Sequence, residues 1–151
     1  MDGKLVAFAP AGLTTYTIPD GVTTIGKRAF SSCSSLTSIT IPDGVTTIGS
    51  YAFFSCRSLT SITLPESLTT IGEMAFYGCE RLTSITIPDG VTTIGIRAFY
   101  SCSSLTSFVG KYTSSDQRCL VMDGKLMAFA PAGLTTYTIP DGVTTIGSYA
   151  F

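Results

Sequence analysis

The chain has 151 residues, of which 44% are hydrophobic and only 13% are charged, and its formal net charge is −1. This length favours a single domain, and because Lys and Arg do not cluster, the sequence excludes an electrostatic surface for nucleic acid or for an anionic membrane. No His is present, so the side chain that most often serves as a general base near neutral pH and as a metal ligand is missing.

One sequence unit recurs along the chain with a period of 23 residues. Each copy follows, with few changes, the pattern Leu-Thr-Ser-Ile-Thr-Ile-Pro-Asp-Gly-Val-Thr-Thr-Ile-Gly-x-x-Ala-Phe-x-x-Cys. A unit of this size cannot bury its own apolar side, so successive copies are expected to stack as coils of a repeat solenoid. The copies begin at Leu13, Leu36, Leu59, Leu82, Leu105 and Leu134.

The copy at residues 36–58 illustrates the elements expected in every coil. Residues 36–41 alternate apolar and polar side chains and are rich in β-branched residues, which predicts a short parallel β-strand. Pro42-Asp43-Gly44 then predicts a turn, because Pro presets φ, Asp caps locally and Gly accepts a positive φ. Residues 45–48 predict a second extended segment, and residues 51–56 a single helical or 3₁₀ turn.

The spacing breaks once, between Leu105 and Leu134, which are 29 residues apart. Asp123-Gly124 lies there between two apolar runs, which predicts a tight hairpin inside an irregular insertion at about residues 109–133. Residues 1–30 match residues 122–151 at all positions except 6, 27 and 28, so residues 1–12 are expected to form a partial copy of this insertion. We therefore expect residues 1–151 to be one solenoid domain, a fragment of a longer array with uncapped end faces.

The motif of residues 36–56, Leu-x-x-Ile-x-Ile-Pro…Ile-Gly-x-x-Ala-Phe-x-x-Cys, resembles the BspA-like leucine-rich repeats. The corner after the strand is Pro-Asp-Gly, whereas the mainstream leucine-rich repeat carries an Asn there. This resemblance implies a leucine-rich-repeat solenoid from a cell-surface or secreted protein of a host-associated microbe. It also implies adhesion to a protein partner, such as extracellular matrix or another host or microbial surface protein. The apolar runs are too short to insert into a bilayer, and we expect any signal peptide or anchor to lie outside this chain.

Four Cys residues form a column with the period of the repeat, and they admit disulfide, metal or packing roles. Stacked residues lie about 5 Å apart with parallel Cα–Cβ vectors, whereas a disulfide needs converging vectors and zinc needs a compact tetrahedral cluster. The pattern therefore favours free, buried thiols. A fifth residue, Cys119, stands outside the column, and either a reactive thiol or a pair with Cys102 remains open. The column consists of Cys33, Cys56, Cys79 and Cys102.

An Asp column could in principle form a calcium ladder, but calcium needs several oxygens converging on one point. One Asp per coil, next to Pro and Gly, is more simply a turn residue, and Glu66-Ser67 interrupts the column. No histidine pairs with a Ser or Cys nucleophile, and no Gly-rich phosphate loop follows a strand, so we expect neither an enzyme nor a bound cofactor or metal. The column consists of Asp20, Asp43, Asp89 and Asp141.

Differences between copies are concentrated just before and just after the Ala-Phe pair. Aromatic and Arg side chains dominate interface hot spots, so these positions are the predicted protein-binding surface, although variation at solvent-facing positions would look the same. For Phe54, Tyr77 and Tyr100, half-buried packing along the ridge is an alternative that the sequence leaves open. We call the following residues the binding ridge: Lys27, Arg28, Tyr51, Phe54, Met74, Tyr77, Arg97 and Tyr100.

The sequence supports three hypotheses of function. The first is a non-enzymatic adhesion or protein-binding module that uses the binding ridge, and the second is a structural spacer within a larger surface protein. The third is ice binding by the ranks of Ser and Thr expected on the outer strand face, which also suit an ordinary exposed strand. That strand face consists of Thr15, Thr17, Ser38, Thr40, Ser61, Thr63, Ser84, Thr86, Thr136 and Thr138. Oligomeric state is not readable from the sequence.

Overall fold

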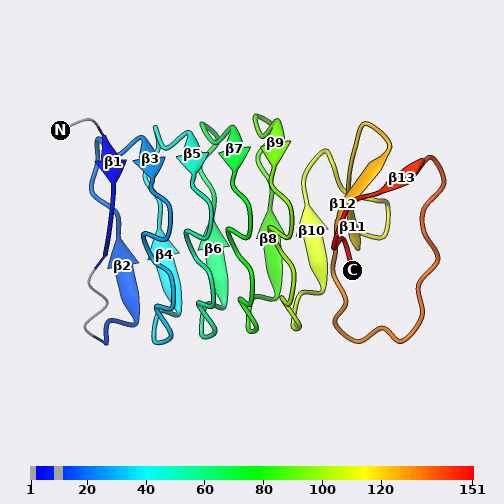
Figure 1. Ribbon diagram of the computed structural model, residues 1–151, viewed down its shortest axis with the longest axis horizontal. Coiled ribbons are helices and arrows are strands. Elements are labelled where there is room, and N and C mark those ends of the chain that lie inside the picture. Colours follow the sequence, from blue (N-terminus) through cyan, green and yellow to red (C-terminus); the bar gives the residue numbers. More distant parts are fainter. Residues whose placement is uncertain (1–2, 9–11) are drawn as a thin grey trace.

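A computed structural model describes residues 3–8 and 12–151. It is a β-solenoid whose coils lie side by side along the long axis (Figure 1). The strands are β1 (Lys4–Leu5), β2 (Thr15–Thr17), β3 (Thr24–Ile25), β4 (Ser38–Thr40), β5 (Thr47–Ile48), β6 (Ser61–Thr63), β7 (Thr70–Ile71), β8 (Ser84–Thr86), β9 (Thr93–Ile94), β10 (Ser107–Val109), β11 (Cys119–Met122), β12 (Lys125–Phe129) and β13 (Thr145–Ile146).

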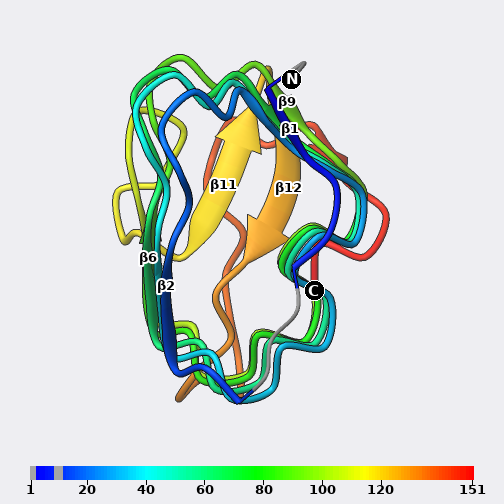
Figure 2. The same ribbon diagram turned by 90° about the vertical axis from the view of Figure 1, so that its left-hand side faces the viewer.

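Each regular coil contributes two short strands, and each joins a parallel ladder along the solenoid. The second extended segments β3, β5, β7 and β9 form one sheet with β1 of the partial copy, in the order β1-β3-β5-β7-β9, while the first strands form the sheets β2-β4-β6 and β8-β10. The copy that begins at Leu134 lacks the expected first strand, so Thr136 and Thr138 lie outside any strand. The register follows the repeat, so Ile39 pairs with Ile62 and Thr47 pairs with Thr70. Viewed along the solenoid, the coils superimpose (Figure 2). The parallel strands and the turn after them match the leucine-rich-repeat solenoid expected from the sequence.

The segment expected to form a helical or 3₁₀ turn is not helical, and no helix occurs in the part of the chain that the structure describes. The Ala52 amide donates within its own coil, to Gly49 O at 3.2 Å, but the Phe53 amide donates to Ala75 O of the next coil at 2.7 Å. Tyr51 has a φ of +62°, which a right-handed helix does not permit. Coil-to-coil hydrogen bonds thus replace helical ones. Residues 3–8 and 12–151 accordingly include no helix long and apolar enough to span a membrane.

The interior is built from columns of identical side chains. Rings of Phe30, Phe53, Phe76 and Phe99 stack nearly parallel, with centroids 5.2, 5.3 and 5.4 Å apart. Neighbouring coils approach so closely at the Ile-Gly corner that a Cβ on Gly72 would lie 2.5 Å from the Ser50 amide nitrogen. The corner therefore accepts only Gly, which explains why Ile-Gly recurs in the copies.

The longer interval after Leu105 contains the antiparallel hairpin β11–β12. Asp123 and Gly124 have φ values of +49° and +74°, as a tight hairpin turn requires. The hairpin crosses the middle of the coil outline (Figure 2), and β12 then pairs in parallel with β13. In the partial copy expected at residues 1–12, β1 pairs with β3 in the same way, while residues 1, 2 and 9–11 lie outside the described residues.

Candidate functional site

The binding ridge predicted from the sequence is brought together on one side of the solenoid, next to the Ala-Phe turns. Three of its eight residues form a column of aromatic rings, one from each of three successive coils. Phe54 and Tyr77 stack with centroids 5.0 Å apart and an interplanar angle of 13°, and Tyr77 and Tyr100 stack at 5.6 Å and 27°. All three side chains are half-buried. Because the ring faces cover one another, the column presents mainly ring edges and phenol hydroxyls to solvent.

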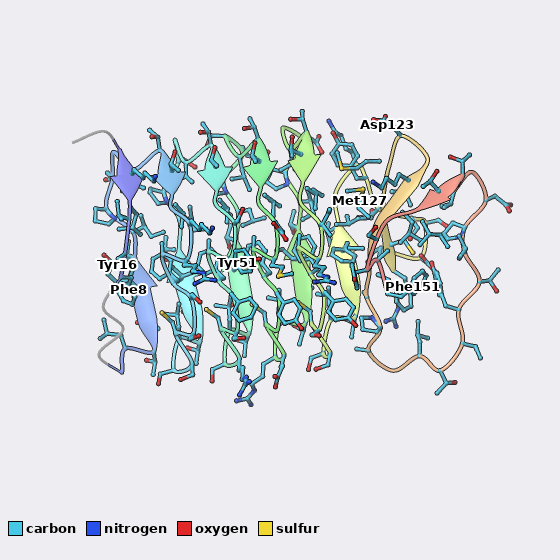
Figure 3. The ribbon with its side chains drawn as sticks, viewed as in Figure 1. Phe8, Tyr16, Tyr51, Asp123, Met127 and Phe151 are labelled. Atoms are coloured by element: carbon cyan, nitrogen blue, oxygen red, sulfur yellow. The ribbon has the colours of Figure 1, made fainter. Side chains whose placement is uncertain are left out.

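A second column lies beside the first and combines cations with aromatic rings. The Arg28 guanidinium lies 5.2 Å from the centroid of Tyr51, and Lys27 Nζ lies 5.9 Å from the same ring. Tyr51 in turn packs against Phe54 at a centroid distance of 5.8 Å, which joins the two columns. Tyr51 is labelled in Figure 3, midway along the solenoid. Cation–π contacts hold these long side chains in place on an otherwise open surface.

Tyr149 of the last coil, which occupies the same variable position as Arg28 in the matching copy, also joins the ridge. The Arg97 guanidinium lies 3.3 Å from the centroid of Tyr149, and the rings of Tyr100 and Tyr149 meet edge to face at 6.0 Å. The insertion contains no Ala-Phe turn of its own, so the coils of Tyr100 and Tyr149 are neighbours on this side. The signal was present in the sequence as the difference between Arg28 and Tyr149 in the two matching copies.

Four of the ridge residues, those directly before an Ala-Phe turn, share an unusual backbone conformation with Ser32, Ser55 and Ser101. In the five coils whose Ala-Phe pair lies in the turn, the residue before the pair has a left-handed φ, where Gly and Asn are least costly and other residues cost on the order of 1 kcal/mol. None of the five copies uses Gly or Asn at that position. Large side chains therefore occupy backbone positions that disfavour them. The φ values are +61° at Arg28, +62° at Tyr51, +50° at Met74, +58° at Arg97 and +59° at Tyr149.

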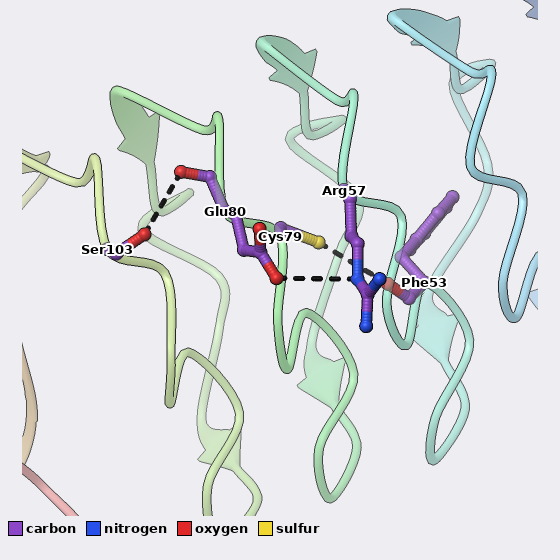
Figure 4. A network of polar contacts seen from close by, with 5 residues as sticks. All are labelled: Phe53, Arg57, Cys79, Glu80 and Ser103. Atoms are coloured by element: carbon purple, nitrogen blue, oxygen red, sulfur yellow. Dashed lines mark hydrogen bonds and ion pairs between the residues drawn. The ribbon is translucent and has the colours of Figure 1, made fainter.

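The Cys column is a packing element that also forms hydrogen bonds. Sγ of Cys56, Cys79 and Cys102 each donates to a Phe carbonyl of the preceding coil, at 3.1, 3.3 and 3.1 Å respectively. Desolvation by burial raises the pKa of the Cys56 and Cys102 thiols to about 12. Metals bind thiolates, so these protonated thiols are poor ligands. Figure 4 shows the Cys79 contact beside an exposed ion pair, Arg57 Nε to Glu80 Oε1 at 3.3 Å.

Cys119 is a free, fully buried thiol and is not paired with Cys102. It belongs to a small polar network under the hairpin, where its Sγ lies 3.2 Å from Tyr137 Oη and Tyr137 Oη donates to Asp116 Oδ2 at 2.9 Å. Desolvation by burial raises the pKa of the Cys119 thiol, so it is not an activated nucleophile. Desolvation also acts to raise the pKa of Asp116, but hydrogen bonds from Ser114, Arg118 and Tyr137 outweigh it and hold the pKa below its usual value.

The other candidate residues named from the sequence do not come together at one site. The residues of the Asp column are all exposed, one at each turn. Within residues 3–8 and 12–151, no group of three or more His, Cys, Asp or Glu side chains is placed to hold a metal ion. On the strand face, the Ser and Thr side chains are mostly exposed, but its ladder is divided into β2-β4-β6 and β8-β10. The binding ridge is therefore the surface with the greatest variety of contact chemistry.

Comparisons with known proteins agree with this architecture. The sequence pattern described as "BspA type Leucine rich repeat region" matches residues 5–118 and 125–151 in six copies. A leucine-rich repeat protein from Bacteroides ovatus is similar, with 47% identity and a TM-score of 0.61 over 66% of this chain and 25% of that protein. A leucine-rich cell surface protein from Faecalibacterium prausnitzii is 32% identical, with a TM-score of 0.62 over 92% of this chain and 45% of that protein.

A more distant structure, the pneumococcal vaccine antigen PcpA, shares the fold at 21% identity, with a TM-score of 0.71 over 99% of this chain and 40% of that protein. No curated protein matches the chain. The chain spans a quarter of the B. ovatus protein and less than half of the other two. The repeat pattern nevertheless covers most of the chain and agrees with the stacked coils, so the chain belongs to the BspA-type leucine-rich-repeat family.

Proposed function

We propose that the chain is a non-enzymatic protein-binding module displayed at a cell surface, and that the binding ridge, extended by Tyr149, contacts its partner. The observation that carries this proposal is the placement of Arg, Tyr and Met at left-handed backbone positions in successive coils. Unfavourable backbone conformations persist where another requirement outweighs stability, and they cluster at functional sites. The strand face, by contrast, keeps nearly the same Ser and Thr residues in each copy, as expected of a scaffold.

The chemistry of the ridge suits a protein partner better than a small molecule. Its aromatic faces are already stacked on one another, so a flat ligand has little free ring surface to stack on. Ring edges, phenol hydroxyls and the cations Lys27, Arg28 and Arg97 instead form an extended strip, in which the rings are half-buried and Lys27 and Arg28 are exposed. An extended strip favours a broad partner surface with accepting groups, and repetition along the coils adds weak contacts through multivalency. Adhesion to matrix, host or other microbial surface proteins is the role that fits such a strip.

The experiment measures binding of the purified chain to a panel of immobilised extracellular-matrix and plasma proteins. A ridge variant carries Tyr51→Ser, Phe54→Ser, Tyr77→Ser and Tyr100→Ser. A matched strand-face variant carries Thr17→Ala, Thr40→Ala, Thr63→Ala and Thr86→Ala. Circular dichroism and denaturant unfolding first establish that both variants fold.

We expect saturable binding by the intact chain, at least a tenfold loss in the ridge variant and no change in the strand-face variant. Equal loss in both variants, or loss only in the strand-face variant, would contradict the assignment of the ridge. No binding across the panel would argue against adhesion to these proteins and favour a spacer role.

A further inference from the structure

Charged side chains are segregated within the regular coils, residues 13–104. The turns after the first strands carry carboxylates only, whereas every Lys and Arg lies between an Ile-Gly corner and the next Leu, in the segment that carries the binding ridge. Only Glu73 and Glu80 oppose the cations in that segment. The side of the solenoid that carries the ridge is therefore positive. Its cations are Lys27, Arg28, Arg57, Arg81 and Arg97.

Two of these cations, Arg28 and Arg97, are held over tyrosine rings. The guanidinium carbon of Arg97 lies 3.3 Å from the ring centroid of Tyr149, and that of Arg28 lies 5.2 Å from the ring centroid of Tyr51. A guanidinium placed over an aromatic ring still has its in-plane N–H groups free to donate to a carboxylate. In the part of the chain that the structure describes, no ion pair includes either Arg. Both groups are therefore positioned donors for a carboxylate of another molecule.

The column of left-handed residues sets the spacing of these donors. Along the solenoid the column contains, in order, Arg28, Tyr51, Met74, Arg97 and Tyr149. Each Arg lies over the Tyr of the next coil on this side, and Met74 separates the two Arg–Tyr pairs. Arg28 and Arg97 are three repeats apart, so stacked strands about 4.8 Å apart place them roughly 14 Å from each other. An extended segment spans about this distance in four residues, and residues i and i+4 of a strand share a face.

The centre of the column has a different chemistry from its ends. Met74 is half-buried and offers a flexible apolar contact, while the adjacent Glu73 is exposed. A carboxylate of the partner at this level would be repelled by Glu73, because like charges at close range disfavour each other. The column therefore favours an acidic residue at each end and an apolar residue in the middle. It disfavours a uniformly anionic polymer, such as a sulfated glycan.

Building on the proposed function, on which this inference rests, we propose that the ridge recognises an extended segment of a different protein. This segment has two acidic residues four positions apart and an apolar residue midway between them. The acidic side chains accept hydrogen bonds from Arg28 and Arg97, and the apolar side chain packs on Met74. Hydrogen bonds between guanidinium and carboxylate groups are stronger than neutral ones and can be bidentate. No two acidic residues of this chain are four positions apart, so a second copy of the chain does not supply the segment.

The probe is a fluorescein-labelled peptide that contains Glu-Thr-Leu-Thr-Glu, titrated with the intact 151-residue chain and followed by fluorescence anisotropy. We expect saturable binding that weakens about fivefold or more between about 50 and 300 mM NaCl, because salt screens its ionic contacts. A peptide with Glu in place of the central Leu should bind about fivefold more weakly. A peptide with Lys at both acidic positions should not bind.

Other coils supply the residues for substitutions that preserve the fold. Arg28→Tyr and Arg97→Tyr each introduce a residue that other coils already carry at the same left-handed position. Together they should weaken peptide binding about tenfold or more. The matched control combines Arg57→Ser and Arg81→Ser, which remove the same charge at positions where other copies carry Ser. It should change binding less than about twofold.

Absence of saturable peptide binding up to 1 mM chain, or equal weakening in the control, would overturn the proposal. So would binding of heparin that is as tight as that of the peptide and depends on Arg28 and Arg97, because the partner would then be an anionic glycan. The panel of matrix and plasma proteins tests the proposed function separately. Panel binding that is lost in the aromatic ridge variant but unchanged in the chain with both Arg→Tyr substitutions would support the proposed function and overturn the acidic segment.

Discussion

Residues 12–30 and 133–151 have almost the same sequence, but they lie towards opposite ends of the solenoid and have opposite exposure. Ile25 and Phe30 are completely buried, whereas the equivalent Ile146 and Phe151 are each 51% exposed. The reverse holds on the other side of the unit, where Leu126 is completely buried and Leu5 is only half-buried. The first copy has a coil after it, and the second has a hairpin and a coil before it.

This inversion shows that burial in a solenoid depends on the neighbouring coil and not on the unit itself. Each coil has two apolar sides, and a side becomes core only when another coil stacks on it. Identical residues in the two copies therefore form natural controls for one another. Matched substitutions in both copies measure how much of the stability comes from stacking.

The largest contrast is expected at the Phe column. Phe30→Ala should lower the free energy of unfolding by about 3–5 kcal/mol, because it leaves a cavity against the stacked ring of Phe53. Phe151→Ala should cost about 1 kcal/mol or less, because half of that side chain is already in water. Guanidinium unfolding followed by circular dichroism measures both. Equal costs would contradict the view that stacking, and not the unit, creates the core.

In the strand before each of the two copies, the C-terminal copy should instead be the more sensitive to substitution, by a smaller margin. Leu126→Ala should cost about 2–4 kcal/mol because Leu126 is covered by the hairpin, whereas Leu5→Ala should cost about 1 kcal/mol. The same unfolding assay applies, with Val6→Ala, at a side chain that is 67% exposed, as a control expected to change little. A cost at Leu5 as large as at Leu126 would mean that β1 is covered in solution.

Removing the hydroxyl of Tyr137 should lower the free energy of unfolding more than removing that of Tyr16. Tyr137→Phe removes contacts with Asp116 and Cys119 and should cost about 1 kcal/mol, while Tyr16→Phe should cost close to nothing. The pH dependence sharpens this contrast. The pKa of Asp116 is held below its usual value, so its contribution is present above about pH 4 and is lost as the pH falls through the folded-state pKa.

The stabilising contribution of Tyr137 is lost as the pH rises, whereas that of Asp116 is lost as the pH falls. Desolvation, followed by the neighbouring Cys119 and Asp116, raises the pKa of Tyr137 in the folded chain. The Tyr137 hydroxyl therefore loses its proton at a lower pH in the unfolded chain than in the folded one. Its contribution is complete below about pH 10 and is lost above that pH. Unfolding free energies measured between pH 8 and 11 should therefore fall less steeply in Tyr137→Phe than in the intact chain. An unchanged slope would mean that this network does not form in solution.

The smallest effects are expected at the left-handed ridge positions. Arg28→Asn should raise stability by about 0.5 kcal/mol, because Asn tolerates a positive φ better than Arg does and this relief exceeds the loss of the single exposed contact with Tyr51. Tyr149→Asn should be close to neutral, because the same relief is offset by loss of the contacts with Arg97 and Tyr100. Differential scanning calorimetry can detect both changes. Clear destabilisation by Arg28→Asn would contradict the view that large side chains at the left-handed ridge positions lower the stability of the fold.

Sequence reasoning predicted the regular coils well because their rules are local and repeated. The alternation in residues 36–41 and the Ile-Gly corner correspond to β4 and to the close approach of neighbouring coils. The predicted helical turn was wrong, because amides such as that of Phe53 bond to the next coil and Tyr51 adopts a left-handed φ. The sequence pattern of one coil does not predict which of its amides donate hydrogen bonds to the neighbouring coil.

For the ridge, variation among copies indicated the positions, but not their mutual geometry. The sequence left open whether Phe54, Tyr77 and Tyr100 pack half-buried along the ridge, and in the structure their rings stack and cover one another's faces. Tyr149 stands at one of the variable positions, but its contact with Tyr100 was not predicted because the two residues are 49 positions apart in the sequence, across the insertion. Only the route of residues 105–133 determines which coils are adjacent on that side.

The sequence by itself determined the repeating unit, the columns that form the core, the free state favoured for the stacked Cys residues and the turn at Asp123-Gly124. These depend on local backbone preferences and on a period that brings like residues into register. The tertiary structure decided which of two matching copies is buried, how the ridge side chains cover one another and where the hairpin lies. Those properties depend on contacts between coils, and identical units in different surroundings make different contacts.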